Sequence, residues 1–266
     1  MHVLKQTLKK ILPETAFKAV RTIYSKTVGR HIDKRNNALV DMYTQRYIDT
    51  RGYVVSGGPF KGLRYVKESV GSSFLHKLAG YYEAVLIPYV EEVKKIPIQH
   101  IVDIGAAEGY YTTGFGSVFK DASITAFEME EKGRKNIQEL HNINNLKNPL
   151  EILGEATADN VFTHIKPGTL LICDCEGAEK NIFASAQAEA KNITYGILEL
   201  HDELIPGCKQ TVLDFFSPTH SIRIVRFDHA NPADFTFFKD IEPSDIEILL
   251  KERGIQDQEW AIVTLK

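Results

Sequence analysis

The sequence has few cysteines and no long apolar stretch. Only Cys173, Cys175 and Cys208 occur among 266 residues, and a small, odd number of cysteines in a chain of this length is typical of free thiols in a reducing compartment. No run of about 18 apolar residues could form a membrane-spanning helix. The first residues place lysines among the apolar positions and so lack the apolar segment of a secretory signal. We therefore expect a cytoplasmic protein.

Signatures of bound zinc, dinucleotides and nucleoside triphosphates are missing too. No second Cys/His pair follows Cys173 and Cys175 at zinc spacing, and a strand would point these two side chains to opposite faces. A G-x-G-x-x-G fingerprint starting at Gly105 fails, because the sequence has Ala107 and Tyr110 where it needs glycine and then glycine or alanine. No G-x-x-x-x-G-K-[ST] motif occurs. Loops that cradle a diphosphate are therefore not expected.

The formal net charge of −3 is unevenly distributed. Residues 1–35 hold nine Lys and Arg against two acidic residues, a charge of +7, which leaves −10 for the rest. A basic segment on an acidic chain indicates docking to something anionic. Helical apolar spacing in residues 3–12 and 17–24 leaves three partners open: an anionic membrane surface, the folded core, or a second subunit of a homo-oligomer. We favour packing on the core or on a second subunit.

The remaining chain divides into two parts by its apolar pattern. Residues 53–66 read as strand, turn and strand, and residues 72–95 have helical spacing. From residue 98 short apolar strands alternate with helices, which predicts a mainly parallel sheet covered on both faces. The expected strands are 98–104, 123–127, 150–153, 170–173, 195–200, 222–227 and 261–265. The expected helices are 109–119, 131–142, 178–190 and 208–216. We therefore place an N-terminal helical and β-hairpin extension at 1–79 and an α/β domain at 80–266.

The first strand of this domain runs into a glycine-bearing turn, VDIGAAEGYYT (residues 102–112). Gly105 and Gly109 let the backbone approach a ligand, to which the following helix presents unpaired N–H groups. Asp103 is placed to orient the turn or to bind a cationic group. Glu128 ends the next strand, where an acid accepts hydrogen bonds from both ribose hydroxyls. Together they predict a nucleoside site without a pyrophosphate, for which S-adenosylmethionine (SAM) is the usual ligand. The alternative is a capped turn and a solvated glutamate.

A third segment, DCEGAE (residues 174–179), puts three acids after an apolar strand, at the edge where open α/β sheets bind ligands. With VDIGAAEGYYT and AFE (residues 126–128), it resembles the FkbM-type SAM-dependent methyltransferases over roughly residues 80–202. The resemblance implies a Rossmann-like class I methyltransferase core: a mostly parallel seven-stranded sheet with an antiparallel last strand and helices on both faces. The chain departs from many relatives at Cys173, where they have lysine, and at Met129, where they have proline.

The resemblance also implies how SAM is held. Its methionine side would contact Asp103, Gly105, Ala107 and Gly109, its ribose Glu128, and its adenine the segment Gly154, Glu155 and Ala156. The implied acceptor is a small-molecule hydroxyl, such as that of a sugar or glycan precursor. A methyltransferase-like nucleoside-binding module without catalysis is the alternative.

Candidates for the chemistry lie at the ends of the later strands. His201 is the preferred base for the acceptor proton, because its ordinary pKa lies nearest neutrality, and Asp174 is the second catalytic candidate. Asp174 with Asp202 or Glu199 could also hold Mg²⁺, although we assign no residue as a metal ligand. The two glutamates of DCEGAE could instead cap the following helix.

We expect no nucleic-acid partner. The sequence has no N/D-P-P-Y/F motif for amino-group methylation. The negative net charge outside the basic segment would also repel phosphates.

Overall fold

The computed structural model describes residues 30–69, 73–185, 188–251 and 258–266. The chain divides into two compact units, Met1–Thr50 and Arg51–Lys266. In the first unit the structure describes helix α3 (Arg30–Arg51), which the apolar spacing did not predict because its residues are largely polar. The helices expected over residues 3–24 lie outside the described residues. Residues 51–79, which the sequence analysis assigned to the extension, group with the second unit.

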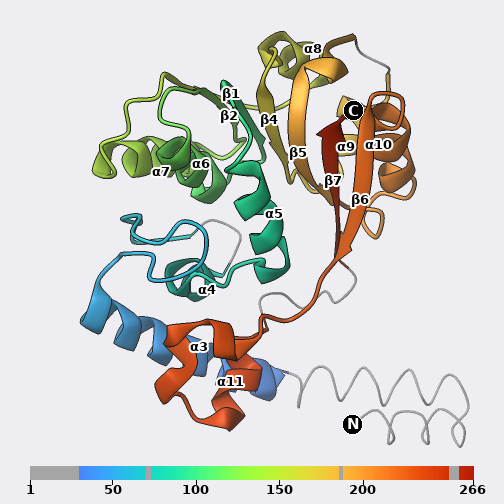
Figure 1. Cartoon of the computed structure of the whole chain (residues 1–266). Helices are drawn as coiled ribbons and strands as arrows, with labels where there is room; N and C mark the ends of the chain where they lie inside the picture. The colour runs from blue at the N-terminus through green and yellow to red at the C-terminus, as the bar shows by residue number, and fades with distance from the viewer. Residues whose placement is uncertain (1–29, 70–72, 186–187, 252–257) are drawn as a thin grey trace, which may run out of the picture. The chain divides into compact units, whose positions relative to one another are not determined.

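The second unit is built on a seven-stranded sheet with the order β3-β2-β1-β4-β5-β7-β6 (Figure 1). The strands are β1 (His100–Ile104), β2 (Ser123–Phe127), β3 (Leu150–Leu153), β4 (Thr169–Cys173), β5 (Ile193–Leu200), β6 (His220–Arg226) and β7 (Glu259–Leu265). The pairs among β1 to β5 are parallel, whereas β7 runs antiparallel to both β5 and β6. The predicted Rossmann-like sheet, mostly parallel with an antiparallel last strand, is therefore confirmed.

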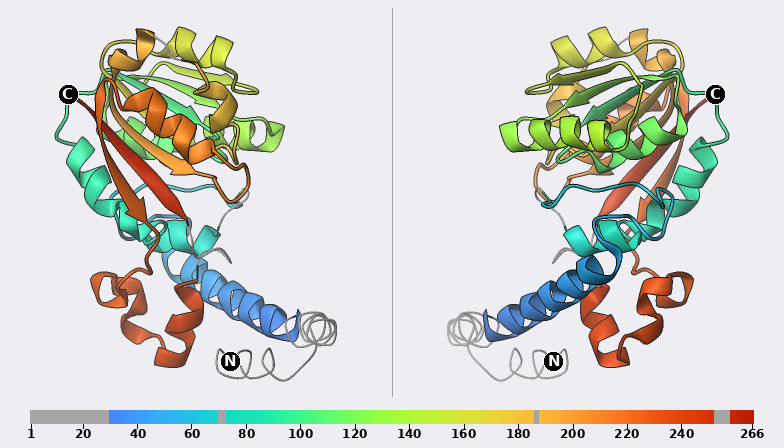
Figure 2. Two further views of the ribbon diagram at one scale, coloured as in Figure 1. Left: turned by 90° about the vertical axis from the view of Figure 1, so that its right-hand side faces the viewer. Right: turned by 90° about the vertical axis from the view of Figure 1, so that its left-hand side faces the viewer.

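Helices cover both faces of this sheet (Figure 2). Helices α6 (Tyr110–Val118) and α7 (Glu131–Ile143) pack on one face, and α8 (Ala158–Val161), α9 (Glu179–Ile182) and α10 (Cys208–Phe216) on the other. The further helical elements of the unit are α4 (Phe74–Ala79), η2 (Ala84–Leu86), α5 (Ile87–Val93), η3 (Phe162–His164), η4 (Ala188–Asn192), η5 (Pro232–Asp234), η6 (Thr236–Asp240) and α11 (Pro243–Leu249). Among the described residues, no helix is both long enough and apolar enough to cross a membrane.

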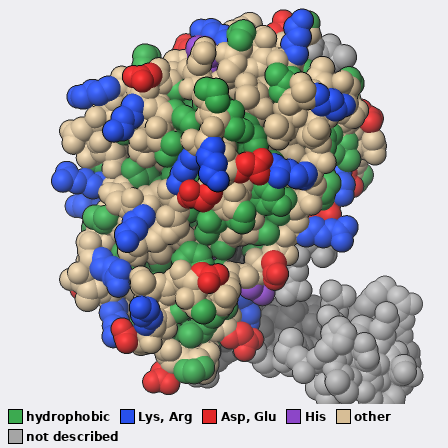
Figure 3. All heavy atoms as spheres, viewed as in Figure 1, with side chains coloured by type: hydrophobic (Ala, Val, Ile, Leu, Met, Phe, Trp, Pro, Cys, Tyr) green, Lys and Arg blue, Asp and Glu red, His purple; other side chains and the backbone are tan. Residues whose placement is uncertain are grey.

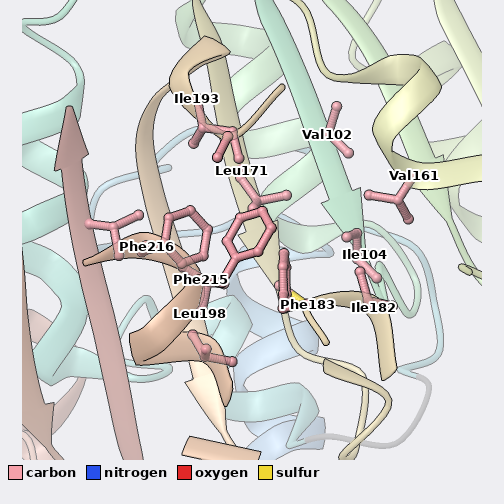
Figure 4. Packing of buried hydrophobic residues seen from close by; sticks show 14 of the residues in the cluster. Val102, Ile104, Val161, Leu171, Ile182, Phe183, Ile193, Leu198, Phe215 and Phe216 are labelled. Atoms are coloured by element: carbon pink, nitrogen blue, oxygen red, sulfur yellow. The ribbon is translucent and has the colours of Figure 1, made fainter. Parts of the chain in front are cut away.

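One apolar core lies between the sheet and helices α9 and α10. Phe183, Phe215 and Phe216 belong to one buried cluster with the strand residues Leu171 and Ile193 (Figure 4). The ring centroids of Phe183 and Phe215 lie 5.0 Å apart. Full burial of one large apolar side chain contributes about 1.5–3 kcal/mol, so this cluster packs α9 and α10 firmly against the sheet.

Two expected helices are shorter than their apolar pattern suggests. The helix expected over residues 72–95 stops at Gly80, whose φ of 88° is left-handed, and resumes as η2 and α5. A Cβ at Gly80 would lie 2.2 Å from the carbonyl oxygen of Gly57, so the break lets two backbone segments touch. The helix expected over residues 178–190 ends at Ile182 and gives way to η4.

The hairpin expected over residues 53–66 is reduced to one antiparallel bridge, between Val54 and Arg64. Beside it, the N–H of Ser56 donates to the carbonyl oxygen of Leu78 at 2.8 Å. The segment therefore docks on α4 rather than pairing along its whole length.

Candidate functional site

A cavity of about 350 Å³ opens at the carboxyl ends of β1, β2 and β4. Small-molecule sites typically span about 300–1,000 Å³. Seven of the nine residues that the sequence analysis proposed line it, namely Asp103, Gly105, Ala107, Glu128, Glu155, Ala156 and Asp174. The other two do not line it. Gly109 is the N-cap residue of α6, with a φ of 96°, and a Cβ there would lie 3.0 Å from Ile137 Cγ1. His201 is 2% exposed.

The turn after β1 adopts a conformation that needs small residues. Gly105 has a φ of 78°, and a Cβ there would lie 1.7 Å from the carbonyl oxygen of Asp174. Ala107 is also left-handed, with a φ of 48°, and its N–H donates to Glu128 Oε2 at 2.7 Å. The N–H of Glu130 donates to Glu128 Oε1, also at 2.7 Å. Glu128 is thereby fixed in place, and each carboxylate oxygen keeps a lone pair for a ligand hydroxyl.

Asp103 is a buried carboxyl group on the floor of the cavity. The hydroxyl of Thr112 donates to its Oδ2 at 2.5 Å. Burial raises the pKa of Asp103 to about 7; the hydrogen bond from Thr112 opposes this shift, and the charges of Asp174 and Glu128 add to it. A cationic ligand in the cavity would stabilise the ionised carboxylate. The electrostatics of the site therefore favour a positively charged ligand.

A buried ion pair borders the same cavity, and sequence reasoning missed it. Lys77 Nζ lies 2.7 Å from Glu108 Oε1, and both side chains are almost fully buried. The hydroxyl of Tyr65 donates to the same oxygen at 2.8 Å, and the ammonium group lies 4.8 Å from the ring centroid of Tyr82. The one available signal was the position of Glu108 inside the glycine turn. This network ties Tyr65 and Lys77 to the ligand-binding loop.

His201 lies at the end of β5 within a group of carboxylates. Its Nδ1 is 2.9 Å from Glu179 Oε1. Its Nε2 lies 3.4 Å from Asp174 Oδ1, 3.7 Å from Glu176 Oε2 and 3.7 Å from Glu199 Oε1. The structure thus brings together the two catalytic candidates, with His201 behind the cavity-lining Asp174.

The surrounding carboxylates control the charge of His201. Burial lowers the pKa of this imidazole, but the hydrogen bond and charge of Glu179, with the charges of Glu199 and Asp174, outweigh it and raise the pKa to about 9. In this arrangement the imidazole holds a proton at neutral pH. A buried, protonated imidazole cannot readily take a proton from an acceptor. His201 is therefore better suited to orient Asp174 than to act as the base.

The two magnesium pairings suggested by the sequence differ in geometry. Oxygen atoms of Asp174 and Glu199 belong to one group within 4.8 Å of one another. Asp202 instead accepts the N–H groups of Gly207 at 2.9 Å and Lys209 at 3.1 Å, at the start of α10. Asp202 therefore fixes the loop before α10, and the pairing of Asp174 with Asp202 has no geometric support.

The cysteine side chains do not point to opposite faces, so that expectation was wrong. Strand β4 ends at Cys173, and the chain turns so that the sulfur atoms of Cys173 and Cys175 lie 3.7 Å apart. Glu179 Oε1 accepts the Cys175 N–H at 2.9 Å, and its Oε2 lies 3.6 Å from Cys208 Sγ. All three thiols are free. Glu179 is thus a buried carboxylate that holds the loop after β4.

Comparisons with known proteins support the fold alone. No protein-family model matches the chain, and no curated protein sequence matches it. Similar solved structures include the precorrin-6y C5,15-methyltransferase of Geobacter metallireducens GS-15, with 10% identity over 76% of this chain and 93% of that one and a TM-score of 0.47. An rRNA methylase of Streptococcus thermophilus shares 8% identity over 68% and 95% of the two chains, with a TM-score of 0.46. Membership of the FkbM-type family stays a prediction from the motifs.

The expectation of no nucleic-acid partner is contradicted by these comparisons. Besides the Streptococcus protein, a putative rRNA methylase of Clostridium thermocellum resembles this chain, with 12% identity over 66% and 92% of the two chains and a TM-score of 0.43. Net charge was also a poor guide, because it averages over the whole surface. On the face seen in Figure 3, Lys and Arg side chains are interspersed with acidic ones. Nucleic acid is therefore no longer excluded as a partner.

Proposed function

We propose that this protein is a SAM-dependent methyltransferase whose acceptor is a hydroxyl group of a small molecule. One observation carries the proposal: the glycine turn after β1, the fixed Glu128 and the buried Asp103 all border one cavity at the carboxyl edge of the sheet. Ligands of open α/β sheets bind at this edge. The motifs that resemble the FkbM-type methyltransferases support the same class, and with it a sugar or glycan precursor as acceptor.

The chemistry of the cavity fits SAM. Glu128 has lone pairs for the two ribose hydroxyls, and Asp103 presents a negative group to the sulfonium and ammonium charges. A Cβ at Gly154 would meet no atom within 4 Å. Open space therefore lies beside the segment that the resemblance assigns to the adenine.

When bound, SAM would supply an electrophilic methyl group to the acceptor oxygen and would leave as S-adenosylhomocysteine, while the acceptor proton would pass to a base. Positioning of the acceptor supplies most of the rate enhancement in such displacements. Asp174 lines the cavity with a side chain that is 33% exposed, so it can touch the acceptor and take its proton. His201 acts as a positioning residue, because its Nε2 lies 3.4 Å from Asp174 Oδ1.

Replacing Asp174 with asparagine is expected to separate binding from chemistry. The substitution keeps the shape of the cavity but removes the base, whose loss typically lowers the rate by about 10²–10⁴-fold. We expect SAM affinity within about threefold of wild type and turnover at least about 100-fold slower. The measurement is formation of S-adenosylhomocysteine with a panel of sugars, polyols and RNA fragments. Asp159→Asn is the control, since Asp159 is exposed and outside the cavity.

The outcomes separate the competing functions. Turnover of Asp174→Asn at the wild-type rate would contradict the proposed chemistry. Turnover only with RNA would keep the enzyme class and replace the acceptor. SAM binding without turnover on any acceptor would favour a nucleoside-binding module.

A further inference from the structure

We propose that Asp174, Glu176 and His201 form a binding site for a divalent cation at the edge of the SAM cavity. One nitrogen atom and two carboxylate oxygen atoms of these residues lie within 4.8 Å of one another. Asp174 and Glu176 also line the cavity. The site deepens the proposed function, because a cation there would lie where the acceptor hydroxyl has to bind.

The Nε2 atom of His201 points to a ligand independently of the acidic residues. The side chain is 98% buried, since only 2% is exposed, and Nε2 makes no hydrogen bond to any residue that the structure describes. Carboxylate oxygens of three residues nonetheless lie near Nε2: Asp174 at 3.4 Å, and Glu176 and Glu199 at 3.7 Å each. Ligand atoms around one metal ion are separated in this way, because each lies about 2.0–2.2 Å from the ion.

The Nδ1 atom of His201 makes the hydrogen bond that is usual for the second ring nitrogen of a metal-binding histidine. Metal-ligating histidines almost always donate their second ring N–H to a carboxylate or a carbonyl group. Here Nδ1 lies 2.9 Å from Glu179 Oε1, and Glu179 is itself fully buried. This hydrogen bond orients the ring and directs Nε2 at Asp174 and Glu176. A metal ion bound there would displace the proton on Nε2, as metal binding to histidine does in general.

The negative charge of the neighbouring side chains also favours a bound cation. Carboxylate oxygens of Glu83 and Glu199 group with that of Asp174 within 4.8 Å, and both glutamates are buried. Buried carboxylates in such numbers are stabilised when they are paired or coordinate a metal.

The donor set selects the kind of ion. Imidazole suits Zn²⁺, Fe²⁺ and similar ions, carboxylates suit Mg²⁺ and Mn²⁺, and a mixed set favours an ion that accepts both. We therefore expect Mn²⁺ or Zn²⁺ to bind more tightly than the Mg²⁺ suggested by the acidic residues alone. An acceptor hydroxyl that reached the open side of the ion would be polarised beside the methyl donor.

The test is a titration of MnCl₂ into the metal-stripped full-length protein, with free Mn²⁺ measured by its electron paramagnetic resonance signal. We expect one Mn²⁺ per chain and affinity at least about 10-fold weaker in Glu176→Gln, the order of loss typical for metal sites. The Glu176 side chain is 71% exposed, so this variant should fold. Glu203→Gln, a nearby exposed acid, should bind as wild type does.

SAM binding measured on the same samples keeps this inference separate from the proposed function. SAM binding without stoichiometric Mn²⁺ binding would overturn the cation site and leave the methyltransferase proposal intact. Mn²⁺ binding that Glu176→Gln and Glu203→Gln weaken equally would also overturn it. Mn²⁺ binding without SAM binding would support the site and contradict the function.

Discussion

Gly105→Ala is expected to abolish measurable SAM binding. The added Cβ would lie 1.7 Å from the carbonyl oxygen of Asp174, and the φ of 78° at Gly105 is unfavourable for alanine. Asp174 cannot simply move away, because its N–H donates to the carbonyl oxygen of Ile104 at 2.9 Å. The turn and the Asp174 loop must therefore separate. We expect SAM affinity to fall at least about 100-fold and stability to fall by about 2–4 kcal/mol.

Gly62→Ala is the matched control for this substitution. Gly62 is also left-handed, with a φ of 99°, but it lies outside the cavity, and a Cβ there would meet no atom within 4 Å. Calorimetric titration with SAM and thermal unfolding of both variants make the comparison. Equal SAM affinity of Gly105→Ala and wild type would show that the turn does not bind the ligand.

Glu179→Ala should destabilise the fold more than any other single change in the carboxylate cluster. The buried carboxylate faces His201 Nδ1 at 2.9 Å and the Cys175 N–H at 2.9 Å. Removing one partner of a buried ion pair leaves the other charge uncompensated and costs about 3–5 kcal/mol. The measurement is the free energy of unfolding in urea. An effect below about 1 kcal/mol would mean that this ion pair does not stabilise the protein.

The exposed neighbour Glu176 provides the comparison for that measurement. Its carboxylate also faces His201, at 3.7 Å, but its side chain is 71% exposed. Exposed ion pairs contribute about 0–1 kcal/mol, so Glu176→Ala should change the unfolding free energy by less than about 1 kcal/mol. A large difference between the two variants would attribute the stabilisation to burial.

The sheet could be predicted from the sequence because each strand is a short apolar run between polar turns. Strand β2 (Ser123–Phe127) and strand β3 (Leu150–Leu153) have the predicted bounds. Helix α3 carries too few apolar residues for the same reasoning. The break at Gly80 depends on contact with Gly57, which no local pattern encodes.

Part of the candidate site could likewise be predicted from the sequence, and part could not. Asp103 and Glu128 could be placed because parallel strands bring their carboxyl ends to one edge of the sheet. The Lys77–Glu108 pair joins a helix outside the motifs to the turn after β1, so spacing along the chain gave no sign of it. The surroundings of His201 depend on two loops folding together, and so its raised pKa could not be read from its residue type.

The most direct measurement is calorimetric titration of the purified protein with SAM, comparing wild type with Glu128→Ala and with Glu130→Ala as the control. A hydrogen bond to a charged group contributes about 1.5–3 kcal/mol, so loss of two ribose contacts should weaken binding at least about 100-fold. Glu130 borders the cavity but offers Glu128 its backbone N–H rather than its side chain, and its variant should bind normally. We predict one SAM per chain in the wild type, lost in Glu128→Ala alone; no binding by the wild type would contradict the account.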